Sequence, residues 1–63
     1  MLTENIKKFL EDEGEIKRGN KSLAITPSGK FGVYVEEHGI DYLIWSMPDT
    51  EDGLIDAIDI LLV

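Results

Sequence analysis

The chain has 63 residues, no cysteine and a formal net charge of −7 at neutral pH. This length predicts a single domain, residues 1–63, with one modest hydrophobic core, and the lack of cysteine excludes disulfides, thiolate zinc sites and a cysteine nucleophile. The negative charge disfavours direct binding to nucleic acid or anionic membranes and favours a protein partner with a basic surface.

The first predicted element is a helix over residues 3–13. Apolar residues recur at helical spacing at Ile6, Phe9 and Leu10. Gly14 supplies a C-terminal stop. On the opposite face, acidic and basic residues lie at i, i+4 spacing, so we expect a charge-balanced scaffold helix.

Three strands are predicted next, over residues 22–26, 31–36 and 40–45, because β-branched and aromatic residues alternate with small or polar ones. Pro27-Ser28-Gly29 suits a three-residue hairpin loop, and His38-Gly39 suits a tight two-residue turn. These loops predict the cross-strand pairs Ile25–Phe31, Leu23–Val33, Val35–Tyr42, Val33–Ile44 and Gly32–Trp45. Residues 15–18 form either a short leading strand or an irregular link.

A second helix is predicted after Pro48, with Asp49 or Thr50 as its N-cap. Its broad apolar face consists of Leu54, Ile55, Ala57, Ile58, Leu61 and Leu62. Asp52, Asp56 and Asp59 fall together on the other side, and no basic residue lies at helical spacing to neutralise them. This acidic stripe is expected to face solvent or a partner.

The predicted fold class is α+β, in the order α-β-β-β-α: a three-stranded antiparallel meander with two helices packed on one face. The other sheet face is then uncovered and gathers Ala24, Tyr34, Leu43 and Trp45, with Glu36 and Asp41 near one end. An apolar aromatic patch bordered by charge is typical of a protein interface. In the alternative arrangement a helix covers each face, and Trp45 belongs to the core.

The same order of elements occurs in the double-stranded-RNA-binding domain, whose second helix begins with a basic cluster. Here the corresponding stretch, residues 48–53, reads Pro-Asp-Thr-Glu-Asp-Gly. Because this charge would repel RNA, the chain is not assigned to that family.

No motif indicates catalysis, a cofactor or a metal site. The single histidine, His38, lies in a predicted turn without an obvious partner. The acidic stretch 49–59 lacks the ligand order of an EF-hand loop, and the serines lack a nucleophile elbow or a base. We therefore expect a protein that is not an enzyme. Residues 1–8 lack the pattern of a signal peptide, so we expect a cytoplasmic location.

The charges are segregated along the chain. Residues 1–30 hold six basic and five acidic residues, a balance of 6 − 5 = +1, whereas residues 31–63 hold eight acidic and no basic residues, a balance of −8. This segregation predicts a small acidic protein-binding module, a stoichiometric inhibitor or adaptor. Its most specific form is a nucleic-acid mimic of the phage type, which inhibits a nuclease, a restriction system or, as an anti-CRISPR protein, a CRISPR effector.

The partner-binding residues predicted on this basis are Tyr34, Glu36, Asp41, Trp45, Asp52, Asp56 and Asp59. The alternative function is a homo-oligomer, such as a homodimer, in which the charge only maintains solubility.

Overall fold

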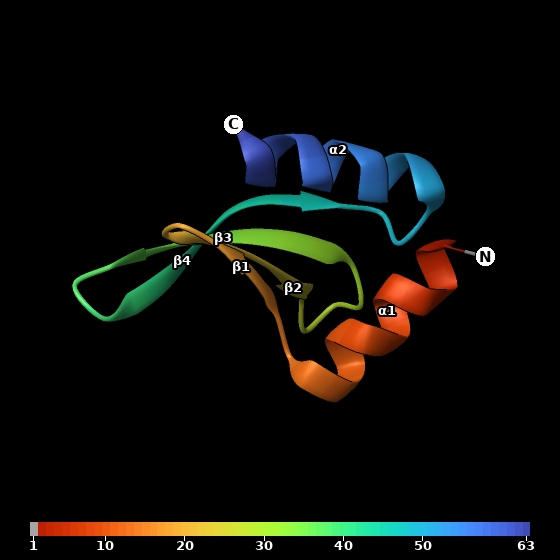
Figure 1. Ribbon diagram of the computed structural model, residues 1–63, viewed down its shortest axis with the longest axis horizontal. Coiled ribbons are helices and arrows are strands. Elements are labelled where there is room, and N and C mark those ends of the chain that lie inside the picture. The colour runs from red at the N-terminus through yellow and green to blue at the C-terminus, as the bar shows by residue number, and fades with distance from the viewer. Residues whose placement is uncertain (1) are drawn as a thin grey trace.

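The computed structural model describes residues 2–63 and has six elements (Figure 1). They are α1 (Leu2–Glu13), β1 (Ile16–Arg18), β2 (Lys21–Ile25), β3 (Phe31–Glu37), β4 (Ile40–Met47) and α2 (Glu51–Leu62). Met1, part of the N-terminal stretch considered above, and the side chain of Leu2 lie outside the described structure. No helix in residues 2–63 is both long and apolar enough to cross a membrane.

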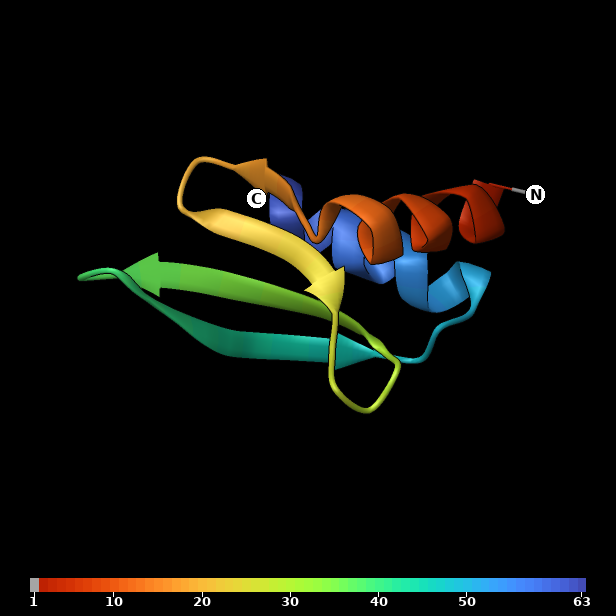
Figure 2. The same cartoon turned by 90° about the horizontal axis from the view of Figure 1, so that it is seen from below.

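The sheet has four antiparallel strands in the order β1-β2-β3-β4, so each strand pairs with its neighbour in the chain (Figure 2). The prediction of an α+β fold is confirmed, but the prediction of three strands is wrong. Residues 16–18 form the additional strand, because Ile16 pairs with Leu23 and Arg18 with Lys21. Gly19, with a φ of 62°, lies in the turn that joins these two strands. β1 and β4 are therefore the two edges of the sheet.

Both predicted hairpin loops are present. The pairs Ile25–Phe31 and Leu23–Val33 are confirmed. His38 and Gly39 have φ angles of 55° and 80°, as a tight two-residue hairpin turn requires.

The register between β3 and β4 differs from the prediction near Trp45. Val35 pairs with Tyr42 as predicted, but Val33 pairs with Trp45 and not with Ile44. The two strands shift register between Val33 and Tyr34, which leaves Ile44 as one extra residue in β4, a β-bulge. Trp45 therefore lies on the same sheet face as Val33, and the predicted Gly32–Trp45 pair is wrong.

The core lies between α2 and the sheet face that carries Val33. It consists of Leu10, Leu23, Phe31, Val33, Met47, Leu54, Ala57 and Leu61. Phe9, which was expected on the apolar face of α1, is 48% exposed, and among residues 3–13 only Leu10 is fully buried in this cluster.

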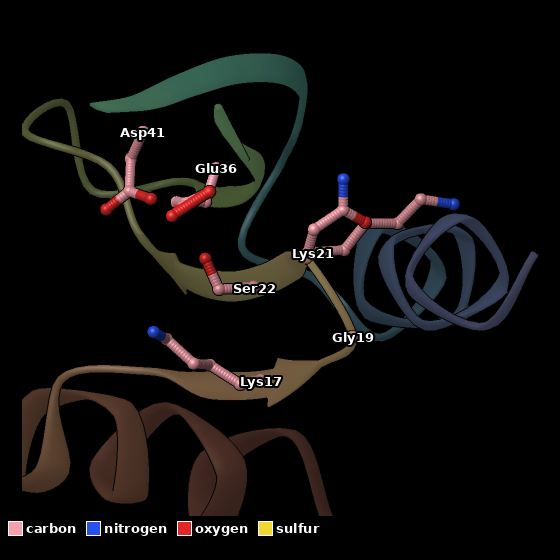
Figure 3. A pocket seen from close by; sticks show the side chains of 7 residues that line it. Lys17, Gly19, Lys21, Ser22, Glu36 and Asp41 are labelled. Carbon is pink, nitrogen blue, oxygen red and sulfur yellow. The ribbon is translucent and has the colours of Figure 1, made fainter. Parts of the chain in front are cut away.

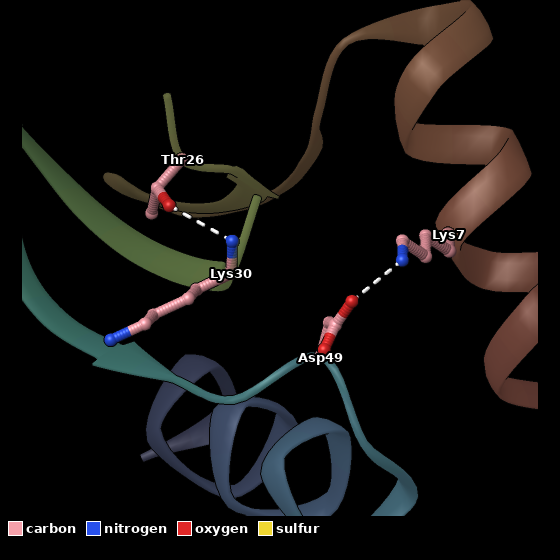
Figure 4. Close-up of polar contacts among 4 residues, drawn as sticks. All are labelled: Lys7, Thr26, Lys30 and Asp49. Carbon is pink, nitrogen blue, oxygen red and sulfur yellow. Dashed lines mark hydrogen bonds and ion pairs between the residues drawn. The ribbon is translucent and has the colours of Figure 1, made fainter. Parts of the chain in front are cut away.

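α2 lies over the sheet, whereas α1 lies near the end of β2 (Figure 1). Lys7 of α1 makes an ion pair with Asp49, with 2.7 Å between Nζ and Oδ2 (Figure 4). Asp49 lies in the loop between β4 and α2, so this ion pair connects α1 with the loop that leads into α2.

Polar contacts fix both ends of α2. Thr50 is the N-cap residue, and its hydroxyl accepts a hydrogen bond from the amide of Gly53 at 3.3 Å. At the other end, the Lys21 ammonium donates hydrogen bonds to the carbonyls of Ile60, at 3.1 Å, and Val63. A cation at this position satisfies carbonyls that have no partner within the helix and complements its dipole.

Candidate partner-binding surfaces

The outer side of α2 carries a row of free carboxylates, which we call the acidic helix face: Asp52, Asp56 and Asp59. All three are exposed. Within residues 2–63 the ion pairs are Lys7–Asp49 and Lys17–Glu15, and neither involves this row. At a rise of about 1.5 Å per residue, the first and last carboxylates lie about 10 Å apart along the helix axis.

The sheet face opposite the core is not covered by a helix. Tyr34 pairs with Ser22 on one side and with Leu43 on the other, so their three side chains share this face. We call the surface of Tyr34, Glu36, Asp41 and Leu43 the open sheet face.

A glycine shapes this face. A Cβ added to Gly32 would lie 2.5 Å from Thr26 Cγ2, 3.0 Å from Leu43 Cδ1 and 3.2 Å from Tyr34 Cε1. The tyrosine and leucine side chains therefore lie close over the backbone of Gly32, and this packing explains why Tyr34 is only partly exposed.

Glu36 and Asp41 lie directly opposite each other in the β3–β4 ladder. Like charges in this position are unfavourable unless a cation is near. The two carboxylates border a hollow of about 220 Å³ whose other lining residues include Lys17 and Ser22 (Figure 3). The open sheet face thus ends in a hollow that is lined by two carboxylates and by Lys17.

The β3–β4 hairpin extends past the C-terminal end of α2 (Figure 1). On the side that faces the helix, β4 carries Ile40, Tyr42, Ile44 and Trp45, which are 45% to 54% exposed. Val35, Glu37, Tyr42 and Ile44 line a hollow of about 290 Å³ on this side. We call the surface formed by Val35, Ile40, Tyr42, Ile44 and Trp45 the hairpin underside.

Sequence reasoning missed this surface because it placed Trp45 on the open sheet face. The available signal was the run from Ile40 to Trp45, in which large apolar residues occupy both odd and even positions. A strand buried on one side alternates more strictly.

The seven predicted partner-binding residues are consequently not brought together. Tyr34, Glu36 and Asp41 lie on the open sheet face, and Trp45 belongs to the hairpin underside. The three aspartates of α2 point away from the sheet, on the side opposite the open sheet face. One flat partner surface therefore cannot contact the open sheet face and the acidic helix face at the same time.

No protein-family model, no curated protein and no solved structure matches this chain. Its function has to be inferred from these surfaces.

Proposed function

We propose that this chain is a non-catalytic protein-binding module that docks on a basic protein surface through the acidic helix face. It would act stoichiometrically, as an inhibitor or adaptor that occupies the partner's surface. The observation that carries the proposal is the row of Asp52, Asp56 and Asp59, which are exposed on one helix and make no ion pair with any of residues 2–63.

The positions of the basic residues support this choice. Lys7 is held by Asp49, Lys21 binds the carbonyls at the end of α2, and Lys17 lies near Glu15. These cations serve contacts away from the outer side of α2. No ion pair within residues 2–63 involves the acidic helix face, and complementary charges across an interface orient the two partners and speed their association.

A groove that binds nucleic-acid phosphates is the most specific kind of basic surface that this face would fit. Carboxylates fixed on a helix can replace phosphates in such a groove, and the chain would then compete with the nucleic acid. This form of the proposal predicts that a bound nuclease, restriction enzyme or CRISPR effector is released from its substrate.

The experiment is quantitative affinity capture from host extract, read by mass spectrometry. The bait variant Asp52→Asn/Asp56→Asn/Asp59→Asn changes the net charge from −7 to −7 + 3 = −4. We expect the wild-type chain to retain a basic protein that this variant loses. Binding should weaken as salt rises, because exposed charge pairs are screened.

The matched control is Glu11→Gln/Asp12→Asn/Glu13→Gln on α1, which makes the same change in net charge at three exposed positions. This control should retain the partner. Equal retention of the partner by both triple variants would rule out the acidic helix face as its binding site.

A further inference from the structure

We propose that two copies of this chain form a two-fold symmetric dimer in which their hairpin undersides pack against each other. This inference does not depend on a basic partner, because it uses a different surface of the molecule. The acidic helix faces do not belong to the dimer contact.

The β-bulge changes the direction of the side chains of Ile44 and Trp45. In a regular strand, Ile44 and Trp45 would point to opposite faces of the sheet. The shift in register places Trp45 opposite Val33, and Ile44 lines a hollow with Val35 and Tyr42. Both consecutive side chains thus lie on the side of the core, where they concentrate apolar surface that α2 does not cover.

The chemistry of this surface favours a second copy over a charged partner. The five residues of the hairpin underside are uncharged, and one carboxylate, that of Glu37, lines the hollow beside them. The acidic helix face and the open sheet face, by contrast, both carry carboxylates. In a two-fold contact the same patch covers itself, so an apolar patch meets another of equal size.

The exposed area is sufficient for such a contact. Ile40, Tyr42 and Trp45 are half exposed, and Ile44 is 45% exposed. Large side chains in this state expose on the order of 100 Å² each, so with Val35 each copy offers roughly 500 Å². When all of this area is covered, two copies bury roughly 1,000 Å² in total, which is about the minimum for a biological interface and corresponds to a weak dimer.

The hollow beside Ile44 has a volume of about 290 Å³ and opens on this same side. In the proposed dimer, Trp45 of each copy enters the hollow of the other. Such a contact also supplements the core, which contains eight buried apolar residues among residues 3–63. Association is a common source of stability for domains of this size.

The test is sedimentation velocity over a range of concentrations up to the millimolar level, combined with fluorescence of Trp45, the single tryptophan. We expect the mass to rise from 7.1 kDa to twice that value. The tryptophan emission should shift to the blue over the same concentration range. A constant mass of 7.1 kDa at every concentration would overturn the proposal.

Ile44→Glu introduces a charge into the hairpin underside and should raise the dimer dissociation constant about tenfold or more. Leu43→Glu is the matched control, because this half-exposed neighbour in β4 lies on the open sheet face. The control should leave the dimer unchanged. If both variants weaken it equally, the contact does not use the hairpin underside.

Tyr42→Glu provides a second disruptive variant in case Ile44→Glu does not fold, and circular dichroism reports the fold of each. The dependence on salt distinguishes dimer formation from docking on a basic partner. Two copies of charge −7 repel each other, so salt should strengthen the dimer and weaken docking on a basic partner.

Discussion

Gly53 shows how a single residue fixes the conformation of a loop. A Cβ built on this residue would lie 2.0 Å from the carbonyl oxygen of Pro48. The chain can therefore enter α2 directly from Pro48 only if the third helical residue has no side chain. Because the obstacle is backbone, a change of rotamer cannot relieve the overlap.

We predict that Gly53→Ala lowers the free energy of unfolding by about 2 kcal/mol, in the range of overpacking substitutions. The measurement is urea denaturation followed by circular dichroism. Asp52→Ala, at the adjacent exposed position, should cost less than about 1 kcal/mol, since it loses only a favourable interaction with the helix dipole. A Gly53→Ala protein as stable as the wild type would show that the loop moves freely.

The ion pair of Lys7 and Asp49 makes the stability of the fold depend on pH. Their hydrogen bond, reinforced by the attraction of the two charges, lowers the pKa of Asp49 from 3.8 and raises the pKa of Lys7 from 10.5. The stabilisation is therefore complete between these two ordinary values. It is lost as the pH falls through the lowered pKa of Asp49 or rises through the raised pKa of Lys7.

Lys7→Met should consequently destabilise the fold near neutral pH and have no such effect in strong acid. Urea denaturation of both proteins across the acid range measures this difference. Lys8→Met, at the neighbouring exposed position, should show no comparable dependence on pH. A Lys7→Met effect that persists below the folded pKa of Asp49 would assign it to packing of the lysine stem instead.

At the scale of elements, the C-terminal end of α2 depends on β2. The ammonium of Lys21 binds the carbonyls of Ile60 and Val63, and the helix has no basic residue in its own last turn. The sheet thus provides the capping charge that the helix sequence lacks.

We predict that Lys21→Met lowers the free energy of unfolding by about 1 to 2 kcal/mol, because two charged hydrogen bonds are lost, of which the one to Ile60 is part-buried. Amide hydrogen exchange should accelerate in the last turn of α2 first. Lys17→Met removes the same charge from β1, where the side chain is 64% exposed, and should change stability by less than about 0.5 kcal/mol. Equal effects of the two substitutions would contradict a specific cap.

The elements differ in how strongly the sequence indicates them. Both helices and the strands over 22–26 and 31–36 have clear periodicity, and the structure confirms them. β1 is harder to predict because Ile16 is its single apolar residue, and its pairing with β2 depends on a contact outside the local sequence. Short strands of this kind are defined by their partners.

The β-bulge is the reason why Trp45 was predicted on the wrong face of the sheet. The apolar run from Ile40 to Trp45 breaks the alternation of β4 but does not show where the extra residue lies, and this residue moves Trp45 to the other face of the sheet. The acidic row on α2 did not depend on register, so helical spacing was sufficient to predict its exposure. The composition of the partner surfaces was therefore more predictable than their relative directions.

At the scale of the whole molecule, a net charge of −7 on 63 residues opposes the compact state. We predict that the midpoint of thermal unfolding rises as sodium chloride screens this repulsion. Dilute protein should be used, so that self-association does not contribute.

The triple variant Asp52→Asn/Asp56→Asn/Asp59→Asn should show a smaller rise with salt than the wild type, because its mutual repulsion is already reduced. The α1 triple variant at positions 11–13 has the same net charge, but it removes carboxylates that lie near Lys7 and Lys8. Its response to salt should remain closer to that of the wild type. A midpoint that falls with salt in the wild-type protein would show that attractive ion pairs dominate.

The order of the strands also has a kinetic consequence. Since every strand pairs with its neighbour in the chain, the sheet can form by successive closure of short loops, each at a low cost in chain entropy. Such local topology is typical of fast folding, on a timescale of about milliseconds. The apolar strand β4 would then spend little time unpaired during folding, which limits the opportunity for aggregation.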